Sequence, residues 1–131
     1  MGFFKDLFGS EQKGTNGVEN SIRWIPLVSL DQLNEIEENS HRRSQVIFKH
    51  STTCGISRMV LNMFGRNLDA SKYPMDFYFL DLHAYRQVSD EVGYRFQVMH
   101  QSPQILVIRN GVTVAHDSHG AINELDLERF V

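Results

Sequence analysis

Cysteine is almost missing from this sequence, since Cys54 is the only one among 131 residues. A single cysteine cannot form an intramolecular disulfide, which excludes the disulfide framework of small secreted proteins and favours a reducing cytoplasm. Long apolar runs are missing too, because no stretch approaches the roughly 20 residues that cross a bilayer. The opening MGFFKDLFGSEQKG carries Lys5 and Asp6 inside its apolar run, unlike a signal peptide. We therefore expect a cytoplasmic protein without a membrane partner.

The sequence also lacks a basic excess and a metal-binding pattern. Lys and Arg number 13 against 16 Asp and Glu, which gives a net charge of −3, and nucleic-acid binding requires a basic face. His116 and His119 stand close together in HDSHG, with His100 further away, whereas a zinc site takes three or four ligands. Phosphate-loop and Ser-His-Asp signatures are absent from the sequence. We expect no nucleic-acid partner, no metal and no bound cofactor.

The composition fits one globular domain. Hydrophobic residues make up 41% and charged residues 22% of the sequence, and a chain of this length buries a single core. FFKDLF near the start is typical of an amphipathic turn, and the Gly-, Ser- and Asn-rich stretch after it is typical of a flexible linker. We divide the chain into this N-terminal turn and linker, residues 1–20, and one domain, residues 21–131.

Hydrophobic periodicity predicts strands and helices in alternation. The expected strands are residues 24–29, 45–50, 75–82 and two more within 103–120, joined by the hairpin signal Asn110–Gly111. The expected helices are residues 30–40 with Ser29 as N-cap, a long helix after Cys54, residues 85–96 with an end near Gly93, and a last helix that docks through Ile122, Leu125, Leu127 and Phe130. This order predicts an α/β fold: a mixed sheet of four to five strands with helices on both faces.

Cys54 lies where a strand gives way to a helix. In KHSTTCGISRMVLNMF, apolar residues recur at helical spacing directly after the cysteine. The sulfur is therefore expected beside unpaired N–H groups at the positive end of the helix dipole, a position that favours the nucleophilic thiolate. Lys49, His50 and Arg58 are near enough in sequence to add positive potential.

Several residues around the thiol have an ordinary structural interpretation as well. A lone cysteine is most often a small buried hydrophobe, although polar and small neighbours here favour an exposed, reactive thiol. Ser57 is either a helix N-terminal hydroxyl or a participant at the site, with equal weight. Thr52 and Thr53 are candidate caps of the helix. Asp81 is interpreted as a turn residue in preference to a proton acceptor beneath the thiol.

The order FKHSTTCGIS after a strand, with HQSPQILVIRNGVTV further along, resembles the thioredoxin fold. Within that fold, the C-x-x-S form resembles the monothiol bacilliredoxins. The resemblance covers residues 24–131 and the start MGFFKDLFG. It implies that residues 21–131 form a thioredoxin-like domain in which Pro103, preceded by Ser102, is cis and lies in a loop that faces Cys54.

The resemblance also implies an activity, namely removal of bacillithiol from S-bacillithiolated proteins. Cys54 would be the nucleophile, with bacillithiol as thiol co-substrate and oxidative stress as the setting. Thr53 and Ser57 match the T-C-P-I-S motif of the family, and Gly55 replaces its proline. Ser57 cannot resolve the mixed disulfide as a second cysteine would, so a thiol from outside must release the adduct. Thr53, Gly55, Ser57, Ser102 and Pro103 are the expected supporting residues.

Two alternatives stay open from the sequence. One is a non-catalytic thioredoxin-like module that binds partners or senses oxidants through Cys54. The other is a monothiol glutaredoxin-like domain that carries an iron-sulfur cluster, which has less support because no basic pattern for glutathione is present. Turnover with an external thiol separates the enzyme from the binding module, and visible absorbance reveals a cluster.

Overall fold

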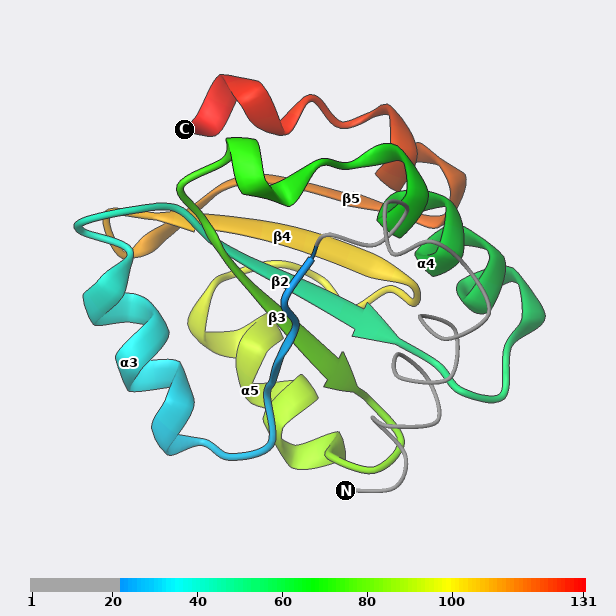
Figure 1. Ribbon diagram of the computed structural model, residues 1–131. Helices are drawn as coiled ribbons and strands as arrows, with labels where there is room; N and C mark the ends of the chain where they lie inside the picture. Colours follow the sequence, from blue (N-terminus) through cyan, green and yellow to red (C-terminus); the bar gives the residue numbers. More distant parts are fainter. Residues whose placement is uncertain (1–21) are drawn as a thin grey trace.

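The structure is a computed structural model that describes residues 22–131, so the expected N-terminal turn and linker lie outside the described residues. Its centre is a mixed sheet of five strands in the order β1-β3-β2-β4-β5 (Figure 1). The strands are β1 (Ile25–Pro26), β2 (Gln45–His50), β3 (Asp76–Asp81), β4 (Gln104–Arg109) and β5 (Val112–Ser118). β1 and β2 pair parallel to β3, and β4 pairs antiparallel with both β2 and β5. The α/β class predicted from the sequence is confirmed.

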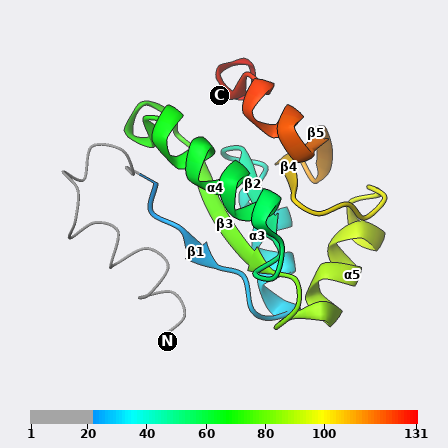
Figure 2. The same ribbon diagram turned by 90° about the vertical axis from the view of Figure 1, so that its right-hand side faces the viewer.

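Helices cover both faces of this sheet. The α-helices are α3 (Asp31–Asn39), α4 (Gly55–Asn67) and α5 (Arg86–Arg95), and the 3-10 helices are η3 (Ala70–Lys72), η4 (His119–Glu124) and η5 (Leu127–Phe130). α4 lies on one side of the strands and α5 on the other (Figure 2). Within residues 22–131, no helix is both long and apolar enough to cross a membrane.

Two hydrophobic cores lie on opposite faces because side chains alternate along β2. Val46 and Phe48 join the core under α4, which also receives Trp24. Ile47 joins the core under α3 and α5. Lys49 and His50, the last two residues of the strand, therefore leave it toward different faces. All six residues of β2 are buried, as expected for the central strand of a sheet covered on both sides.

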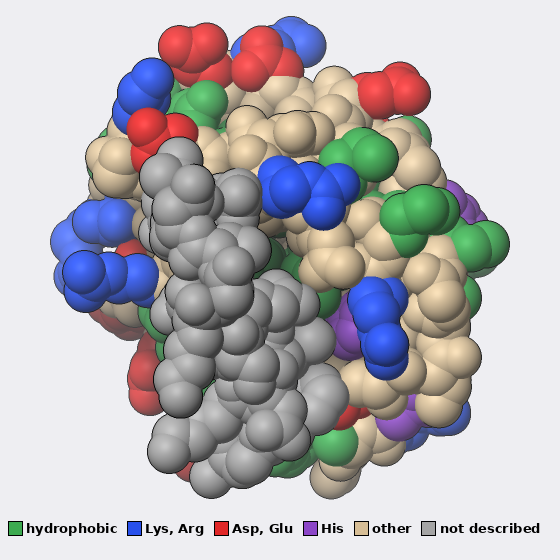
Figure 3. All heavy atoms as spheres, turned by 45° about the vertical axis from the view of Figure 1, so that its right-hand side comes forward, with side chains coloured by type: hydrophobic (Ala, Val, Ile, Leu, Met, Phe, Trp, Pro, Cys, Tyr) green, Lys and Arg blue, Asp and Glu red, His purple; other side chains and the backbone are tan. Residues whose placement is uncertain are grey.

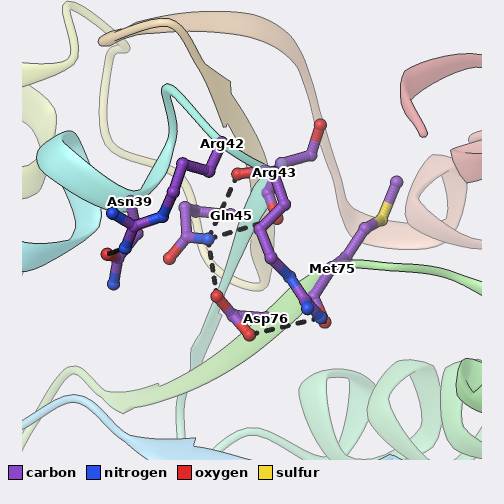
Figure 4. Close-up of polar contacts among 7 residues, drawn as sticks. Asn39, Arg42, Arg43, Gln45, Met75 and Asp76 are labelled. Carbon is purple, nitrogen blue, oxygen red and sulfur yellow. Dashed lines mark hydrogen bonds and ion pairs between the residues drawn. The ribbon is translucent and has the colours of Figure 1, made fainter.

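Polar contacts fix the starting ends of β2 and β3 against each other (Figure 4). The Gln45 amide nitrogen donates to an Asp76 carboxylate oxygen at 2.7 Å. Arg43 donates to the Met75 carbonyl oxygen at 2.9 Å and forms an ion pair with Asp76 at 3.4 Å. Gln45 and Asp76 are also register partners in the parallel pair. These contacts set the strand register at the end of the sheet opposite to the one that carries Cys54.

The start of α3 differs from the prediction. Ser29 is not its N-cap, because Leu30 occupies that position and makes no side-chain cap. The side chain of Gln32 takes over: its carbonyl oxygen accepts from the N–H groups of Val28 and Ser29, at 2.7 and 3.0 Å, and its amide nitrogen donates to the Pro26 carbonyl oxygen. The Gln32 side chain thus ties the segment before the helix, Pro26 to Ser29, to the first turn of α3.

Two later helices also depart from the expectation. α5 runs through Gly93 and ends at Arg95. A Cβ at position 93 would lie 3.0 Å from the Val98 carbonyl oxygen, so the glycine allows the following loop to pack against the helix, and it is not a helix end. The C-terminal segment forms η4 and η5 in place of one α-helix. Ile122 and Leu127 are nevertheless buried in the core under α4.

The predicted hairpin is confirmed. Asn110 and Gly111 connect β4 to β5 with positive φ values of 54° and 83°, the conformation that favours an Asn-Gly pair. The backbone N–H of Asn110 donates to the Ser40 carbonyl oxygen, and that of Gly111 to the Ser40 hydroxyl. The hairpin is therefore tied to the end of α3.

Candidate functional site

Cys54 is the N-cap residue of α4, at the edge of the sheet where β2 and β3 end. Its backbone is extended, with φ −111° and ψ 119°, and the helix begins at Gly55. The Cys54 N–H donates to the Ser51 carbonyl oxygen at 3.3 Å, and the Cys54 carbonyl oxygen accepts the first helical bond from Arg58. The thiol is free and partly exposed. The sulfur thus lies at the positive end of a helix dipole, the location expected from the sequence.

The hydroxyl of Ser57 belongs to a buried polar pair behind the thiol loop. It accepts from the Ser51 N–H at 3.1 Å and lies 2.9 Å from Nδ1 of His50. Both Ser57 and His50 are almost fully buried, at 0% and 1% exposure. Because the strand residue His50, the loop residue Ser51 and the helix residue Ser57 meet here, the pair ties three consecutive segments together around Cys54.

His50 does not add the positive potential that its nearness to Cys54 in the sequence made possible. Burial lowers the pKa of His50 to about 4, Asp81 opposes this shift, and Arg58 and His83 reinforce it. The ring is therefore neutral near pH 7. Lys49 does not serve the thiol either, because its Nζ lies on the other face of the sheet, 3.1 Å from the Ser89 carbonyl oxygen.

His83 is a member of the site that sequence reasoning missed. Its Nε2 lies 2.9 Å from the Ser51 hydroxyl and 3.3 Å from the Thr53 hydroxyl, which are 3.2 Å apart. Thr53 is therefore engaged with Ser51 and His83 and is not a cap of α4, whose N-cap makes no side-chain cap bond. One signal was available: His83 is two residues beyond the end of β3, and the carboxyl ends of parallel strands lie at one edge of a sheet.

Asp81 stabilises the turn after β3 that contains His83. One of its carboxylate oxygens accepts from the N–H groups of His83 and Ala84, at 3.1 and 3.3 Å. This is the turn role that the sequence favoured over a proton acceptor beneath the thiol. The Leu82 N–H also donates to the His50 carbonyl oxygen at 3.1 Å, which keeps the turn beside the end of β2.

Ser102 and Pro103 lie at the same edge of the sheet as Cys54. β4 runs antiparallel to β2, and Gln104 is the register partner of Lys49, so the loop that ends at Pro103 reaches β4 where β2 ends. The bond between Ser102 and Pro103 is cis, as the resemblance implies. The Pro103 carbonyl oxygen accepts from the His119 N–H at 3.0 Å.

Gly55 occupies the first position of α4 in open surroundings. A Cβ at this residue would meet nothing within 4 Å. The extended backbone of Cys54 is also the conformation that a residue before proline adopts. The structure around Gly55 is therefore compatible with the proline that the family motif carries at this position, and the first helical position is one that proline favours.

The solvent-facing side of α4 is rich in apolar residues. Ile56, Met59 and Met63 are 57%, 59% and 39% exposed. Ile56 is thus one of the apolar residues after Cys54 that face solvent and not the core. On this side of the molecule, hydrophobic and basic side chains lie next to one another at the surface (Figure 3). Ile56 is two residues from Cys54, so the apolar surface begins beside the thiol.

Within residues 22–131, no group of three or more potential metal ligands is present. His116 and His119 belong to β5 and η4 respectively. The candidate site is thus a single thiol at a helix start, with a neutral histidine and hydroxyl groups behind it and the Ser102–Pro103 loop at the same edge of the sheet.

Comparison with solved structures supports the fold. A candidate oxidoreductase with a thioredoxin fold is 33% identical, with a TM-score of 0.62 over 75% of this chain and 84% of its own. A Schistosoma mansoni thioredoxin is 18% identical, with a TM-score of 0.66 over 86% of this chain and 99% of its own. Thioredoxin NaTrxh from Nicotiana alata is 21% identical, with a TM-score of 0.66 over 85% of this chain and 95% of its own. The thioredoxin fold predicted from the sequence is confirmed.

Comparison with protein families identifies the group within this fold. Residues 25–127 match the family described as monothiol bacilliredoxin BrxC. The match includes the thiol loop, α4 and the Ser102–Pro103 loop, and extends to η5. Family and fold together are those of thiol-disulfide redox proteins. The chain therefore belongs to the monothiol bacilliredoxin (BrxC) family.

Proposed function

We propose that this protein is a monothiol thiol-disulfide exchange enzyme that removes bacillithiol, or a similar small thiol, from S-thiolated cytoplasmic proteins. The observation that carries the proposal is the single thiol of Cys54 at the start of α4 in a chain of this family. A thiol at a helix start is in the position of reactive cysteines, which sit in electropositive and partly exposed surroundings. The partial exposure of Cys54 fits this class.

The proposed reaction has two exchange steps. The Cys54 thiolate attacks the bacillithiol sulfur of a client mixed disulfide, so the client sulfur leaves as a thiolate and takes up a proton. Cys54 then carries bacillithiol in a new disulfide. A second bacillithiol thiolate attacks the bacillithiol sulfur of that adduct, which regenerates the Cys54 thiolate and produces bacillithiol disulfide. Electrons balance because each step breaks one disulfide and forms another.

Ser57 supports a monothiol cycle in two ways. It stands where a C-x-x-C protein has the resolving cysteine, and a hydroxyl cannot replace a thiolate in thiol-disulfide exchange. Its hydroxyl is also already hydrogen-bonded to the Ser51 N–H and to His50, which gives it a structural role. An external thiol must therefore release the bacillithiol adduct from Cys54, as the second exchange step proposes.

Two surfaces beside the thiol suit a protein client. Ile56, Met59 and Met63 offer an apolar surface along α4, and methionine adapts to differently shaped partners. The loop with Ser102 and cis-Pro103 lies at the same edge of the sheet as Cys54 and offers main-chain groups to an extended segment. We assign the supporting roles at the site to Thr53, Gly55, Ser57, Ser102 and Pro103.

The test is mass spectrometry of the protein mixed with a bacillithiolated client peptide, beside the Cys54→Ala variant. We expect the bacillithiol mass to move to Cys54 while the client is freed, and to leave Cys54 when bacillithiol is added. With the variant, the client should lose bacillithiol only at the uncatalysed rate. A capped client beside an unmodified Cys54 would contradict the proposal and would favour a non-catalytic binding or sensing module.

A further inference from the structure

Lys49 is a fully buried lysine whose side chain lies on the face of the sheet opposite the His50–Ser57 pair. Its Nζ donates to the Ser89 carbonyl oxygen of α5 at 3.1 Å and lies 3.3 Å from Nδ1 of His100. His100 belongs to the loop that leads to Ser102 and Pro103. One ammonium group thus connects β2, which leads into the thiol loop, with α5 and with the second loop of the candidate site.

Gln104 holds the same loop from the neighbouring strand. Its amide nitrogen donates to the Met99 carbonyl oxygen at 2.9 Å. Gln104 is the register partner of Lys49 in the β2–β4 pair, so two residues side by side in the sheet bind two consecutive residues of one loop. The loop between Met99 and Pro103 is therefore attached to the central strands by side chains as well as by the chain itself.

Stability alone is a poor explanation for a lysine at this position. Removing an ammonium group from water is costly, and apolar residues of similar volume often replace buried charges without loss of stability. Lys49 lies beside the core under α3 and α5, whose member Ile47 precedes it on the same face of β2. Burial lowers the pKa of Lys49 to about 8, against the opposing charge of Asp90. A methionine would fill this space, but it would not bind Ser89 or His100.

We propose that Lys49 is a positioning residue of the exchange reaction: by holding His100 to β2, it fixes the Ser102–Pro103 loop relative to Cys54. This rests on the proposed function, because the loop matters only if a client segment binds there. Lys49 itself does not touch the reacting sulfurs in this scheme. Its loss should weaken client binding and leave the chemistry of the Cys54 thiol unchanged.

The test compares Lys49→Met with Lys72→Met, which removes the same charge from an exposed position on η3. In Lys49→Met, we expect amide hydrogen exchange at Val98 and His119 to accelerate about tenfold, because these N–H groups form hydrogen bonds at the two ends of the loop. We also expect KM for the bacillithiolated peptide to rise about tenfold, the effect of losing one hydrogen bond to a charged group. The kcat and the alkylation rate of Cys54 by iodoacetamide should stay within about twofold, because neither uses the loop. Lys72→Met should match the wild type throughout.

Two outcomes would overturn the proposal. In one, hydrogen exchange and KM in Lys49→Met match those of Lys72→Met. In the other, alkylation of Cys54 slows in parallel with the exchange reaction, which would mean that Lys49 acts on the thiol or the whole fold. A wild-type protein that leaves the client capped would refute the proposed function instead. Hydrogen exchange would then still decide whether Lys49 holds the loop.

Discussion

Lys49 and His50 are consecutive residues of β2, yet they organise two different regions of the molecule. His50 faces α4 and joins Ser57 behind the thiol loop, whereas Lys49 faces α5 and joins Ser89 and His100 behind the other loop. Both side chains are buried and polar. The comparison shows how the end of a central strand can position two loops at once, because neighbouring side chains leave a strand on opposite faces.

The two regions differ in how completely their polar groups are satisfied. On the α4 face, the Ser57 hydroxyl has two partners, the Ser51 N–H and His50 Nδ1. On the α5 face, the buried Ser89 hydroxyl and the Gln104 side-chain oxygen have no hydrogen-bond partner among the described residues. A substitution that removes the Ser57 hydroxyl therefore leaves buried groups without a partner, whereas one that removes the Ser89 hydroxyl does not.

The largest expected effect uses two serines that are buried alike. Ser57→Ala should lower the free energy of unfolding by about 2–4 kcal/mol, because two buried groups lose a partner. Ser89→Ala should change it by less than about 0.5 kcal/mol or raise it, because no partner is lost. Urea unfolding followed by circular dichroism measures both. Equal losses in the two variants would show that the two faces do not differ.

A second prediction separates the two faces by pH. The lowered pKa of His50, about 4 against an ordinary 6.5, means that the unfolded chain binds the proton more readily. This histidine therefore contributes stability above pH 6.5 that is lost as pH falls toward 4, on the order of 3 kcal/mol. Lys49 has the opposite position on the pH scale, with a pKa of about 8 in the folded protein against an ordinary 10.5. The free energy of unfolding therefore rises as pH increases from 8 to 10.5, because the buried ammonium is already neutral while the unfolded chain still binds the proton.

Unfolding by urea across this pH range, with one variant for each face, provides the measurement. His50→Gln should flatten the acid part of the stability curve, and Lys49→Met the alkaline part. His116→Gln and Lys72→Met, both at exposed positions, should keep the wild-type curve. An acid slope that survives in His50→Gln would mean that other groups cause it.

The smallest expected effect concerns the thiol loop alone. Gly55→Pro should raise the free energy of unfolding by about 0.4–1 kcal/mol, because it restricts the unfolded chain at a position where proline fits. Gly120→Pro offers a comparison at a second open position, within η4. It should not stabilise the protein, because His119 before it has a φ of 56° and a residue before proline favours extended backbone. Thermal unfolding measures both variants, and destabilisation by Gly55→Pro would mean that the Gly55 N–H or its backbone angles matter to the loop.

Much of the fold follows from local patterns in the sequence. The strand 45–50 and the Asn110–Gly111 hairpin were predicted at the residues where they occur, because a short apolar run and turn chemistry are local signals. Helix boundaries were less predictable. The bonds from Gln32 to the segment before α3, and the loop that requires Gly93, depend on contacts that no periodic pattern records.

The candidate site was predictable in part. The location of Cys54 at a helix start follows from a strand that is succeeded by helical spacing. The partners of Ser57 and the place of His83 depend on which strands pair, so they needed the sheet. Lys49 was considered as a source of positive potential at the thiol because it is near in sequence, but alternation along β2 places its side chain on the other face. The catalytic and supporting roles of the site residues stay predictions.

The protein's only tryptophan is packed in a cluster of aromatic rings. Trp24 lies 5.9 Å from Phe48 of β2 and 6.1 Å from Phe64 of α4, measured between ring centroids. Its indole therefore contacts both the strand that leads into the thiol loop and the helix that begins at it. The protein carries an intrinsic fluorophore at this junction, so tryptophan emission can follow any movement of α4 when a small thiol is attached to Cys54, without a label.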